Sequence, residues 1–313
     1  MKMKRVLIDI LQAMATRFST WLRRAVMLLL DVAKEQLFHF RRERRRQQQF
    51  IQQVLATSHA FNDRRLIVSL STLPDRIGGL QPTLESLLTQ TRPPDEIVLA
   101  IPKLSVRQNR EYIIPNYLAT MPRVRLLQAE TDWGPATKFI PVIRAELKAG
   151  RPDTLIMVVD DDRVYPRDSV ALYLHYNAQS PNAALCFRGG PLERSRNGRH
   201  YKTIFGIDLQ SPERVAVMTG CGSYLIQPRF FDETLWDYSA APKGAFYMDD
   251  IWISGCLDRR GVEKYVVPAS RMMRTALRQF GTMTLHDVPN GWRHNNNEAI
   301  EFFRSSWNIF TSR

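Results

Sequence analysis

The sequence predicts an α/β fold with a mostly parallel central sheet and flanking helices, preceded by a helical extension. After Arg65, short apolar runs alternate with amphipathic helical segments, and most of the runs are continuously apolar. Continuous apolar strands are typical of sheets covered on both faces, and strand–helix alternation favours right-handed crossovers and parallel pairing. In addition, 44% of the 313 residues are hydrophobic, which is enough for a large core without disulfides.

The net charge of +13 is concentrated at the N-terminus. Residues 1–65 hold 14 Lys and Arg against 5 Asp and Glu, and so carry nine of the thirteen net charges. We therefore divide the chain into a basic extension, 1–64, and a folded domain, 65–313. The domain sequence has no basic patch interleaved with aromatic residues, so nucleic acid is not an expected partner. Three cysteines without a CxxC pair indicate a reducing compartment, the cytoplasm.

The extension combines an amphipathic helical pattern with a cluster of five arginines between residues 41 and 46. The apolar residues of the pattern are Phe18, Leu22, Ala25, Leu29, Val32 and Ala33. This combination suits peripheral contact with the anionic inner face of the plasma membrane; the alternative is a solvated or partner-binding helix. The longest apolar run, 25–30, is far shorter than the roughly 20 residues that span a bilayer. We therefore expect no membrane-spanning helix.

Four strands and two helices are predicted in the first half of the domain. The strands lie at 66–70, 96–101, 124–127 and 155–159, and the helices at 80–90 and 136–148. We expect all four strands to be buried on both faces, although Arg125 interrupts the third. A ligand site is expected at the carboxyl ends of these strands.

The second half is less regular. Strands are predicted at 183–187, 215–218, 224–227 and 265–267 around one helix at 249–260, which Gly261 ends as a C-terminal cap. The Pro-, Arg- and Gly-containing stretch 189–198 predicts a mobile loop within one continuous domain.

The fourth strand runs directly into three adjacent carboxylates, Asp160, Asp161 and Asp162. Neighbouring carboxylates repel one another, so positive charge is expected beside them. Alternate residues of an extended chain point the same way, so Asp160 and Asp162 can face one site while Asp161 points elsewhere. Carboxylate and phosphate oxygens are the ligands that Mg²⁺ and Mn²⁺ prefer. The alternative is an acidic turn satisfied by backbone amides and by arginines such as Arg163.

A second polar segment follows the third strand. Gly134 and Pro135 predict a tight turn into a helix that starts near Ala136, and free amides at such a start suit phosphate or ribose oxygens. Lys138 in the first turn indicates an anionic ligand, or else it extends into solvent. Two roles are open for Asp132: it either accepts a hydrogen bond from a nucleobase or ribose hydroxyl, or it only caps the turn.

Asp249 and Asp250 open the helix of the second half, where carboxylates are favourable as caps. Two carboxylates exceed what a cap needs, so one is free to deprotonate a bound hydroxyl if the start of the helix faces the ligand site. We assign that role to Asp250 and a capping or acceptor-orienting role to Asp249; the reverse assignment stays open. The small residues of 219–223 suit close approach of a ligand to the backbone, or else form a β-bulge or hairpin turn.

Taken together, these segments resemble the GT-A fold glycosyltransferases, in particular bacterial, family 2-like enzymes with a DxD motif. The segments are Ser69–Arg76, Thr131–Lys138, Asp160–Asp162 and Met248–Trp252, in this order within residues 65–275. The resemblance implies a Rossmann-like GT-A fold and transfer of a hexosyl group from a nucleotide-diphosphate sugar. The segment 95–102 departs from family 2, because it lacks the acidic pair and Gly-Ser that often follow the second strand.

The resemblance also implies roles for individual residues. Asp160, Asp162 and the later His286 would hold Mn²⁺ or Mg²⁺, although an isolated histidine in a polar stretch is also typical of solvent exposure. The nucleotide sugar would contact Ser71, Thr72, Arg76, Asp132, Gly134, Lys138 and Asp161. With Asp250 as base, inversion at the anomeric carbon is the simpler outcome. The implied acceptor is a glycan or lipid-linked glycan of bacterial surface glycan synthesis.

Two other function classes fit parts of the sequence. A nucleotidyltransferase also uses sheet-end carboxylates and a metal, but a glycine-rich phosphate loop is expected after its first strand, and 71–76 contains no glycine. The other class is a non-catalytic basic module that binds a membrane or nucleic acid and has a degenerate α/β core.

Overall fold

The computed structural model divides the chain into two compact units, Met1–Gln52 and Gln53–Arg313. The residues that it describes are Leu29, Lys34 and the ranges 42–56, 64–195, 198–271, 274–275 and 291–307. Residues 42–56 are helical, and the predicted amphipathic segment before them lies, except for Leu29, outside the described residues. No helix among the described residues is long and apolar enough to cross a membrane.

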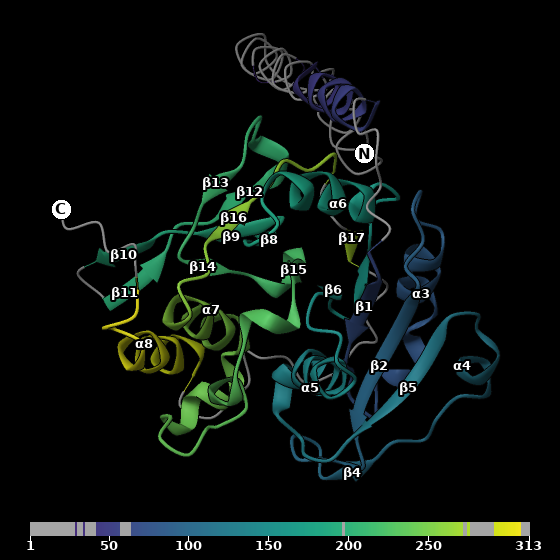
Figure 1. The fold of residues 1–313 in the computed structure, drawn as a ribbon, viewed down its shortest axis with the longest axis vertical. Coiled ribbons are helices and arrows are strands. Elements are labelled where there is room, and N and C mark those ends of the chain that lie inside the picture. Colours follow the sequence, from purple (N-terminus) through teal and green to yellow (C-terminus); the bar gives the residue numbers. More distant parts are fainter. Residues whose placement is uncertain are drawn as a thin grey trace, which may run out of the picture. The chain divides into compact units, whose positions relative to one another are not determined.

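An eight-stranded sheet forms the centre of the second unit, in the order β13-β16-β8-β15-β6-β1-β2-β5 (Figure 1). β6, β1, β2 and β5 pair in parallel, as do β16 and β8. β15 is antiparallel to β6 and β8, and β13 is antiparallel to β16. The prediction of an α/β fold with a mostly parallel sheet is confirmed.

The predicted elements of the first half are all present. Their bounds are β1 Leu66–Leu70, α3 Gln81–Leu88, β2 Glu96–Pro102, β5 Val124–Ala129, α5 Ile140–Lys148 and β6 Leu155–Val158. One boundary was predicted wrongly, because α5 begins at Ile140 and not near Ala136. A 3₁₀ helix, η2 (Gly134–Lys138), precedes α5, whose first turn contains Pro141. Proline suits a first turn, where its missing N–H costs no helical bond.

The expectation that all four strands are buried on both faces is wrong for β5. Arg125 and Leu126 are exposed, whereas β1 is buried throughout. The physical reason is position: β5 is the edge strand and pairs only with β2 in this sheet. The polar interruption at Arg125 was the sequence signal of that edge.

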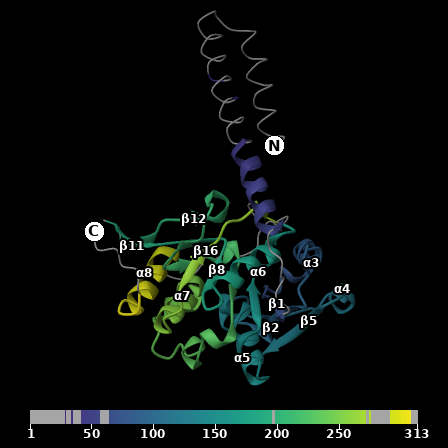
Figure 2. The same cartoon turned by 45° about the horizontal axis from the view of Figure 1, so that its top comes forward.

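The two faces of the sheet pack against different helices. Ile67, Val98 and Ile156 belong to one core cluster together with residues of α5, α7 (Asp249–Arg259) and α8 (Trp292–Phe302). α7 and α8 lie side by side in both views (Figure 1, Figure 2). Alternate strand residues such as Val68 and Leu99 point to the opposite face and are also fully buried. The central strands are therefore covered on both faces.

The predicted strands of the second half are also present, as β8 Ala184–Cys186, β14 Val217–Met218, β15 Tyr224–Ile226 and β16 Lys264–Val266. α7 ends at Arg259, and Gly261 has the positive φ (68°) that a C-terminal glycine adopts. After α8, Phe303 and Trp307 are buried, so the C-terminal segment docks on the core. Outside residues 188–201, the remaining strands and α-helices of this unit are β3 Leu104–Ser105, β4 Arg110–Glu111, α4 Asn116–Thr120, β7 Arg163–Val164, α6 Ser169–Gln179, β12 Ile204–Phe205, β13 Glu213–Arg214 and β17 Arg274–Thr275.

The stretch 189–198, predicted as a mobile loop, instead contributes to three strands. These are β9 Arg188–Gly190, β10 Leu192–Ser195 and β11 Gly198–Tyr201. β10 and β11 form an antiparallel hairpin, and β9 pairs with β12 and β14. A side chain at Gly189 would place its Cβ 2.5 Å from the carbonyl oxygen of Val217. Glycine therefore permits close strand approach here and is not a sign of mobility.

Candidate functional site

The acid triplet lies at the carboxyl ends of two neighbouring parallel strands. β1 and β6 pair with Ser69 opposite Val158, so the segments that follow each strand leave the sheet side by side. Thr72 Oγ1 donates a 2.6 Å hydrogen bond to Asp161, and Arg76 forms an ion pair with the same carboxylate. Two residues of the segment after β1 thus lie beside the triplet. Ser71, in the same segment, is partly buried.

The three carboxylates do not point as strand alternation predicts. Asp161 and Asp162 both lie near Arg76, at 3.6 Å for Asp162, whereas Asp160 lies against Lys138. The reason is that β6 ends at Val158, so residues 160–162 follow the strand as a turn, where alternation does not hold. The Tyr165 hydroxyl accepts a 2.9 Å hydrogen bond from the Asp160 amide and fixes this turn.

Every carboxylate of the triplet faces a cation of the protein itself. Asp162 lies 3.3 Å from Arg163, the arginine named in the acidic-turn alternative. Burial raises the pKa of Asp161 to about 6, although Arg76 and Thr72 act against this. Burial also disfavours the charged form of Asp160, but Lys138, Arg163 and Arg76 together hold the pKa of that carboxyl below its ordinary value. The charge repulsion inferred from the sequence is therefore offset within the chain.

Lys138 joins the triplet to the start of α7. Its Nζ lies 2.9 Å from Asp160 Oδ1 and 2.9 Å from Asp249 Oδ2. Its side chain is 11% exposed, so the solvent-exposed alternative is wrong. Although burial lowers it, these two carboxylates raise the pKa of Lys138 well above its ordinary value. Lys138 is a fixed positive charge inside the site.

Asp249 and Asp250 occupy the first turn of α7, as predicted, but neither is the cap. The N-cap is Met248, and Asp249, which is 4% exposed, is turned to Lys138. The capping role for Asp249 is therefore wrong. Asp250 Oδ1 accepts a 2.8 Å hydrogen bond from the Gly220 amide, and no ion pair to Asp250 occurs among the described residues. Burial and the neighbouring Asp249 raise the pKa of Asp250 to about 8, against the effect of Lys138.

The turn before Lys138 is built around Asp132 and Gly134. Asp132 Oδ1 accepts from the amide of Gly134 at 2.7 Å and from the hydroxyl of Thr137 at 3.2 Å, while Oδ2 accepts from the amide of Val106 at 2.7 Å. Asp132 therefore caps the turn in this structure. Gly134 has a φ of 58°, and a Cβ there would lie 2.7 Å from the Phe246 ring, so only glycine fits.

The small-residue segment between β14 and β15 packs directly on the charged cluster. It forms a 3₁₀ turn, η4 (Gly220–Gly222), and neither of the two turn types named from the sequence. A Cβ on Gly220 would lie 2.7 Å from Lys138 Nζ and 2.9 Å from Asp250 Oδ1. The small residues thus do permit close approach to the backbone here, but the groups that approach it are the side chains of Lys138 and Asp250.

Tyr224, the first residue of β15, belongs to this cluster and was missed from the sequence. It is fully buried, its hydroxyl has no hydrogen-bond partner in the described part of the chain, and it interacts electrostatically with Lys138, Asp249 and Asp250. A tyrosine directly after a glycine-rich turn was the available signal. Its inward direction depends on the register of β15 against β6, which the sequence does not specify.

The carboxylates at the carboxyl end of β6 are oxygen ligands of the kind that a divalent cation prefers. Side chains of Asp160 and Asp162 are 26% and 23% exposed, and Lys138 binds Oδ1 of Asp160, which leaves Oδ2 for another cation. No group of three or more His, Cys, Asp or Glu in the described ranges is arranged to hold a metal. His286 lies outside those ranges. Another histidine of the same stretch, His294, is exposed and pairs with Glu298.

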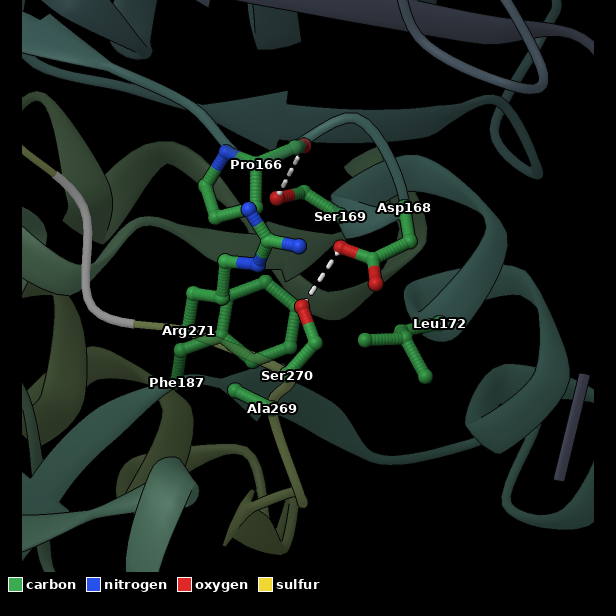
Figure 3. A pocket seen from close by; sticks show the side chains of 8 residues that line it. All are labelled: Pro166, Asp168, Ser169, Leu172, Phe187, Ala269, Ser270 and Arg271. Atoms are coloured by element: carbon green, nitrogen blue, oxygen red, sulfur yellow. Dashed lines mark hydrogen bonds between the residues drawn. The ribbon is translucent and has the colours of Figure 1, made fainter. Parts of the chain in front are cut away.

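A small pocket lies away from these residues, between the start of α6 and the segment after β16 (Figure 3). Ser270 donates a 2.7 Å hydrogen bond to Asp168 across it. Its lining residues are Pro166, Asp168, Ser169, Leu172, Phe187, Ala269, Ser270 and Arg271. None of the site residues predicted from the sequence is among them.

No family model and no curated protein matches the chain. Among solved structures, the chain is similar to the crystal structure of 4-diphosphocytidyl-2C-methyl-D-erythritol synthase, with 14% sequence identity and a TM-score of 0.42, over 70% of this chain and 95% of that chain. A likeness this distant decides nothing about activity or substrate.

Proposed function

We propose that the protein is a metal-dependent glycosyltransferase, which transfers a hexosyl group from a nucleotide-diphosphate sugar to a hydroxyl acceptor. One observation carries the proposal. Asp250 lies in a cluster of carboxylates at the carboxyl end of the sheet, yet among the described residues its carboxylate accepts a hydrogen bond only from the Gly220 amide and forms no ion pair. Asp160, Asp161, Asp162 and Asp249 each face Lys or Arg. Asp250 is thus the carboxylate best placed to take a proton.

The proposed step is a single displacement. The acceptor hydroxyl oxygen forms a bond to the anomeric carbon, the bond from that carbon to the diphosphate oxygen breaks, and the hydroxyl proton passes to the Asp250 carboxylate. A base works best when its pKa lies near the working pH, and the raised pKa of Asp250, about 8, meets this condition. Attack from the side opposite the leaving group inverts the anomeric configuration.

The donor is proposed to lie over the ends of β1 and β6. Asp160 and Asp162 would hold Mg²⁺ or Mn²⁺, which supplies positive charge against the leaving diphosphate when bound. Arg76, whose side chain is 24% exposed, is held by Asp161 at this edge and is available to a phosphate oxygen. Ser71 and Thr72 precede it in the segment that we assign to the nucleotide.

The acceptor is proposed to be a glycan or a lipid-linked glycan of a bacterial surface polymer. The basic residues of the extension support this, because contact with an anionic membrane would keep the site near a lipid-linked acceptor. Arg42, Arg44, Arg45 and Arg46 are exposed on the helix formed by 42–56.

The test is product release by the full-length chain with Mn²⁺. A glycosyltransferase releases a nucleoside diphosphate from its nucleotide sugar, slowly even with water as acceptor. A nucleotidyltransferase releases pyrophosphate from a nucleoside triphosphate and a sugar phosphate. We expect the first product from one member of a nucleotide-sugar panel, and a loss of at least about 100-fold in Asp250→Asn. Pyrophosphate release alone, or full activity of Asp250→Asn, would reject the proposal.

A further inference from the structure

Lys138 binds carboxylates from both halves of the site. Its Nζ lies 2.9 Å from Asp160, which follows β6, and 2.9 Å from Asp249, which begins α7. The ammonium group donates a hydrogen bond to Asp160 and forms an ion pair with Asp249. Lys138 is just 8% exposed, so little of its side chain is open to a phosphate of the donor. The geometry is that of an internal counter-cation.

The position of the ammonium group is fixed from several sides. The backbone carbonyl of Lys138 accepts a 2.6 Å hydrogen bond from Ser69, so β1 anchors the residue. Gly220 leaves the space beside Nζ, where a Cβ would approach to 2.7 Å. The buried hydroxyl of Tyr224 faces the same group of charges. Movement of the ammonium group away from Asp160 would therefore require these neighbours to rearrange.

A divalent ion held by Asp160 would lie close to this ammonium group. Both cations draw on the same carboxylate, and the ion on Oδ2 would lie beside the ammonium on Oδ1. Like charges repel strongly in a poorly hydrated site. A diphosphate brought in by the donor adds negative charge and reduces that repulsion.

We infer that Lys138 competes with the divalent ion for Asp160, so that the ion binds weakly alone and tightly as a complex with the donor diphosphate. This inference rests on the proposed function, because it takes Asp160 as a ligand of the ion. It makes Lys138 a positioning residue that couples metal binding to donor binding. Such a coupling is reciprocal, so the donor also binds more weakly without the ion.

The experiment measures Mn²⁺ binding to the full chain by titration calorimetry, with no nucleotide present. We expect Lys138→Met to bind Mn²⁺ roughly 5- to 100-fold more tightly than the wild type, the usual range of a site–site coupling. Lys138→Arg keeps the charge and should bind as the wild type does. With a preformed complex of Mn²⁺ and uridine diphosphate as the titrant, Lys138→Met and the wild type should agree within about threefold.

Removing Lys138 leaves Asp249 buried without its cation, which can destabilise the fold. The double variant Lys138→Met, Asp249→Asn removes both charges and keeps Asp160, and it should show the same gain in Mn²⁺ affinity. If this variant folds and binds Mn²⁺ with the same affinity as the wild type, the inference about Lys138 is overturned, but the proposed function is not. If neither protein binds Mn²⁺ in any titration, the metal site of the proposed function fails with it. The difference in affinity between Lys138→Met and the wild type should shrink when the titrant is the complex of Mn²⁺ and uridine diphosphate. A difference as large as with Mn²⁺ alone would overturn the coupling.

Discussion

The amide of Gly220 donates a 2.8 Å hydrogen bond to Oδ1 of Asp250 and so ties the turn η4 to the start of α7. A Cβ at this position would come within 2.7 Å of Lys138 Nζ and 2.9 Å of Asp250 Oδ1. We expect Gly220→Ala to destabilise the chain by about 1–3 kcal/mol, as overpacking does, and to reduce donor turnover by at least about tenfold, since a small misplacement of a reacting group is costly.

The matched control is Gly78→Ala, because a Cβ there would meet nothing within 4 Å. Thermal unfolding and nucleoside diphosphate release measure both effects. Unchanged turnover in Gly220→Ala would show that this turn does not position the base.

Asp250 should make stability depend on pH. Its pKa is about 8 in the folded chain, against 3.8 ordinarily, so the folded state binds a proton that the unfolded state has released. Stability from this group is therefore complete below about pH 4 and is lost as the pH rises to about 8. The surrounding ionisable groups are Asp249, Lys138, Asp160, Tyr224, Cys186 and Cys221.

The test is Asp250→Asn, which keeps an acceptor for the Gly220 amide and removes the charge. Relative to the wild type, the variant should gain about 2–4 kcal/mol of unfolding free energy between pH 5 and pH 8. Denaturant unfolding at several pH values measures this difference. A difference that does not change with pH would mean that Asp250 titrates at its ordinary pKa.

The acid triplet predicts a metal-dependent thermal shift. Mn²⁺ with uridine or guanosine diphosphate at about 100 times the dissociation constant should stabilise the wild type by about 2.7 kcal/mol, or roughly 5–10 °C in melting temperature. Asp162→Ala should abolish this rise, and EDTA should reverse it in the wild type. Asp237→Ala is the control, because Asp237 bonds only to Ser239 among its described contacts. A full shift in Asp162→Ala would remove Asp162 from the ligands.

The sheet and the sheet-edge part of the site could be predicted from the sequence. Strands β1 and β6 coincide with continuous apolar runs, and Thr72, Arg76 and Asp161 lie at the carboxyl ends of these strands, where a ligand site was expected. That β1 and β6 are neighbours was learned only from the structure. The direction of each carboxylate could not be predicted, because alternation ends with the strand at Val158.

Contacts between distant segments were likewise beyond the sequence. The pairing of Lys138 with Asp249 depends on how the start of α7 comes to lie beside η2, and local periodicity carries no information on such docking. The hairpin of β10 and β11 was mistaken for a loop because its Arg- and Gly-containing sequence shows no alternation of polar and apolar residues that would indicate strand pairing.

The exposed arginines of the extension should control binding to anionic vesicles. Replacing Arg42, Arg44, Arg45 and Arg46 by Gln removes four exposed charges from the helix of 42–56. Each basic residue near an anionic surface contributes about 1 kcal/mol, so affinity for phosphatidylserine-containing vesicles should fall by roughly 100-fold or more. Vesicles of neutral lipid are the control, and flotation measures the bound fraction. Unchanged binding would show that the arginines serve another partner.

Alanine variants of Gly134 and Gly150 distinguish the effect of backbone strain from the effect of crowding at the site. Both have positive φ, 58° and 68°, but a Cβ meets the Phe246 ring at 2.7 Å only at Gly134, while nothing lies within 4 Å of one at Gly150. Gly150→Ala should therefore cost only the left-handed conformation, about 1–2 kcal/mol. Gly134→Ala adds overpacking of about 1–3 kcal/mol and displaces the turn that leads to Lys138, so it should also lower donor turnover. Equal losses of stability and turnover in the two variants would contradict this, because strain alone would then explain both.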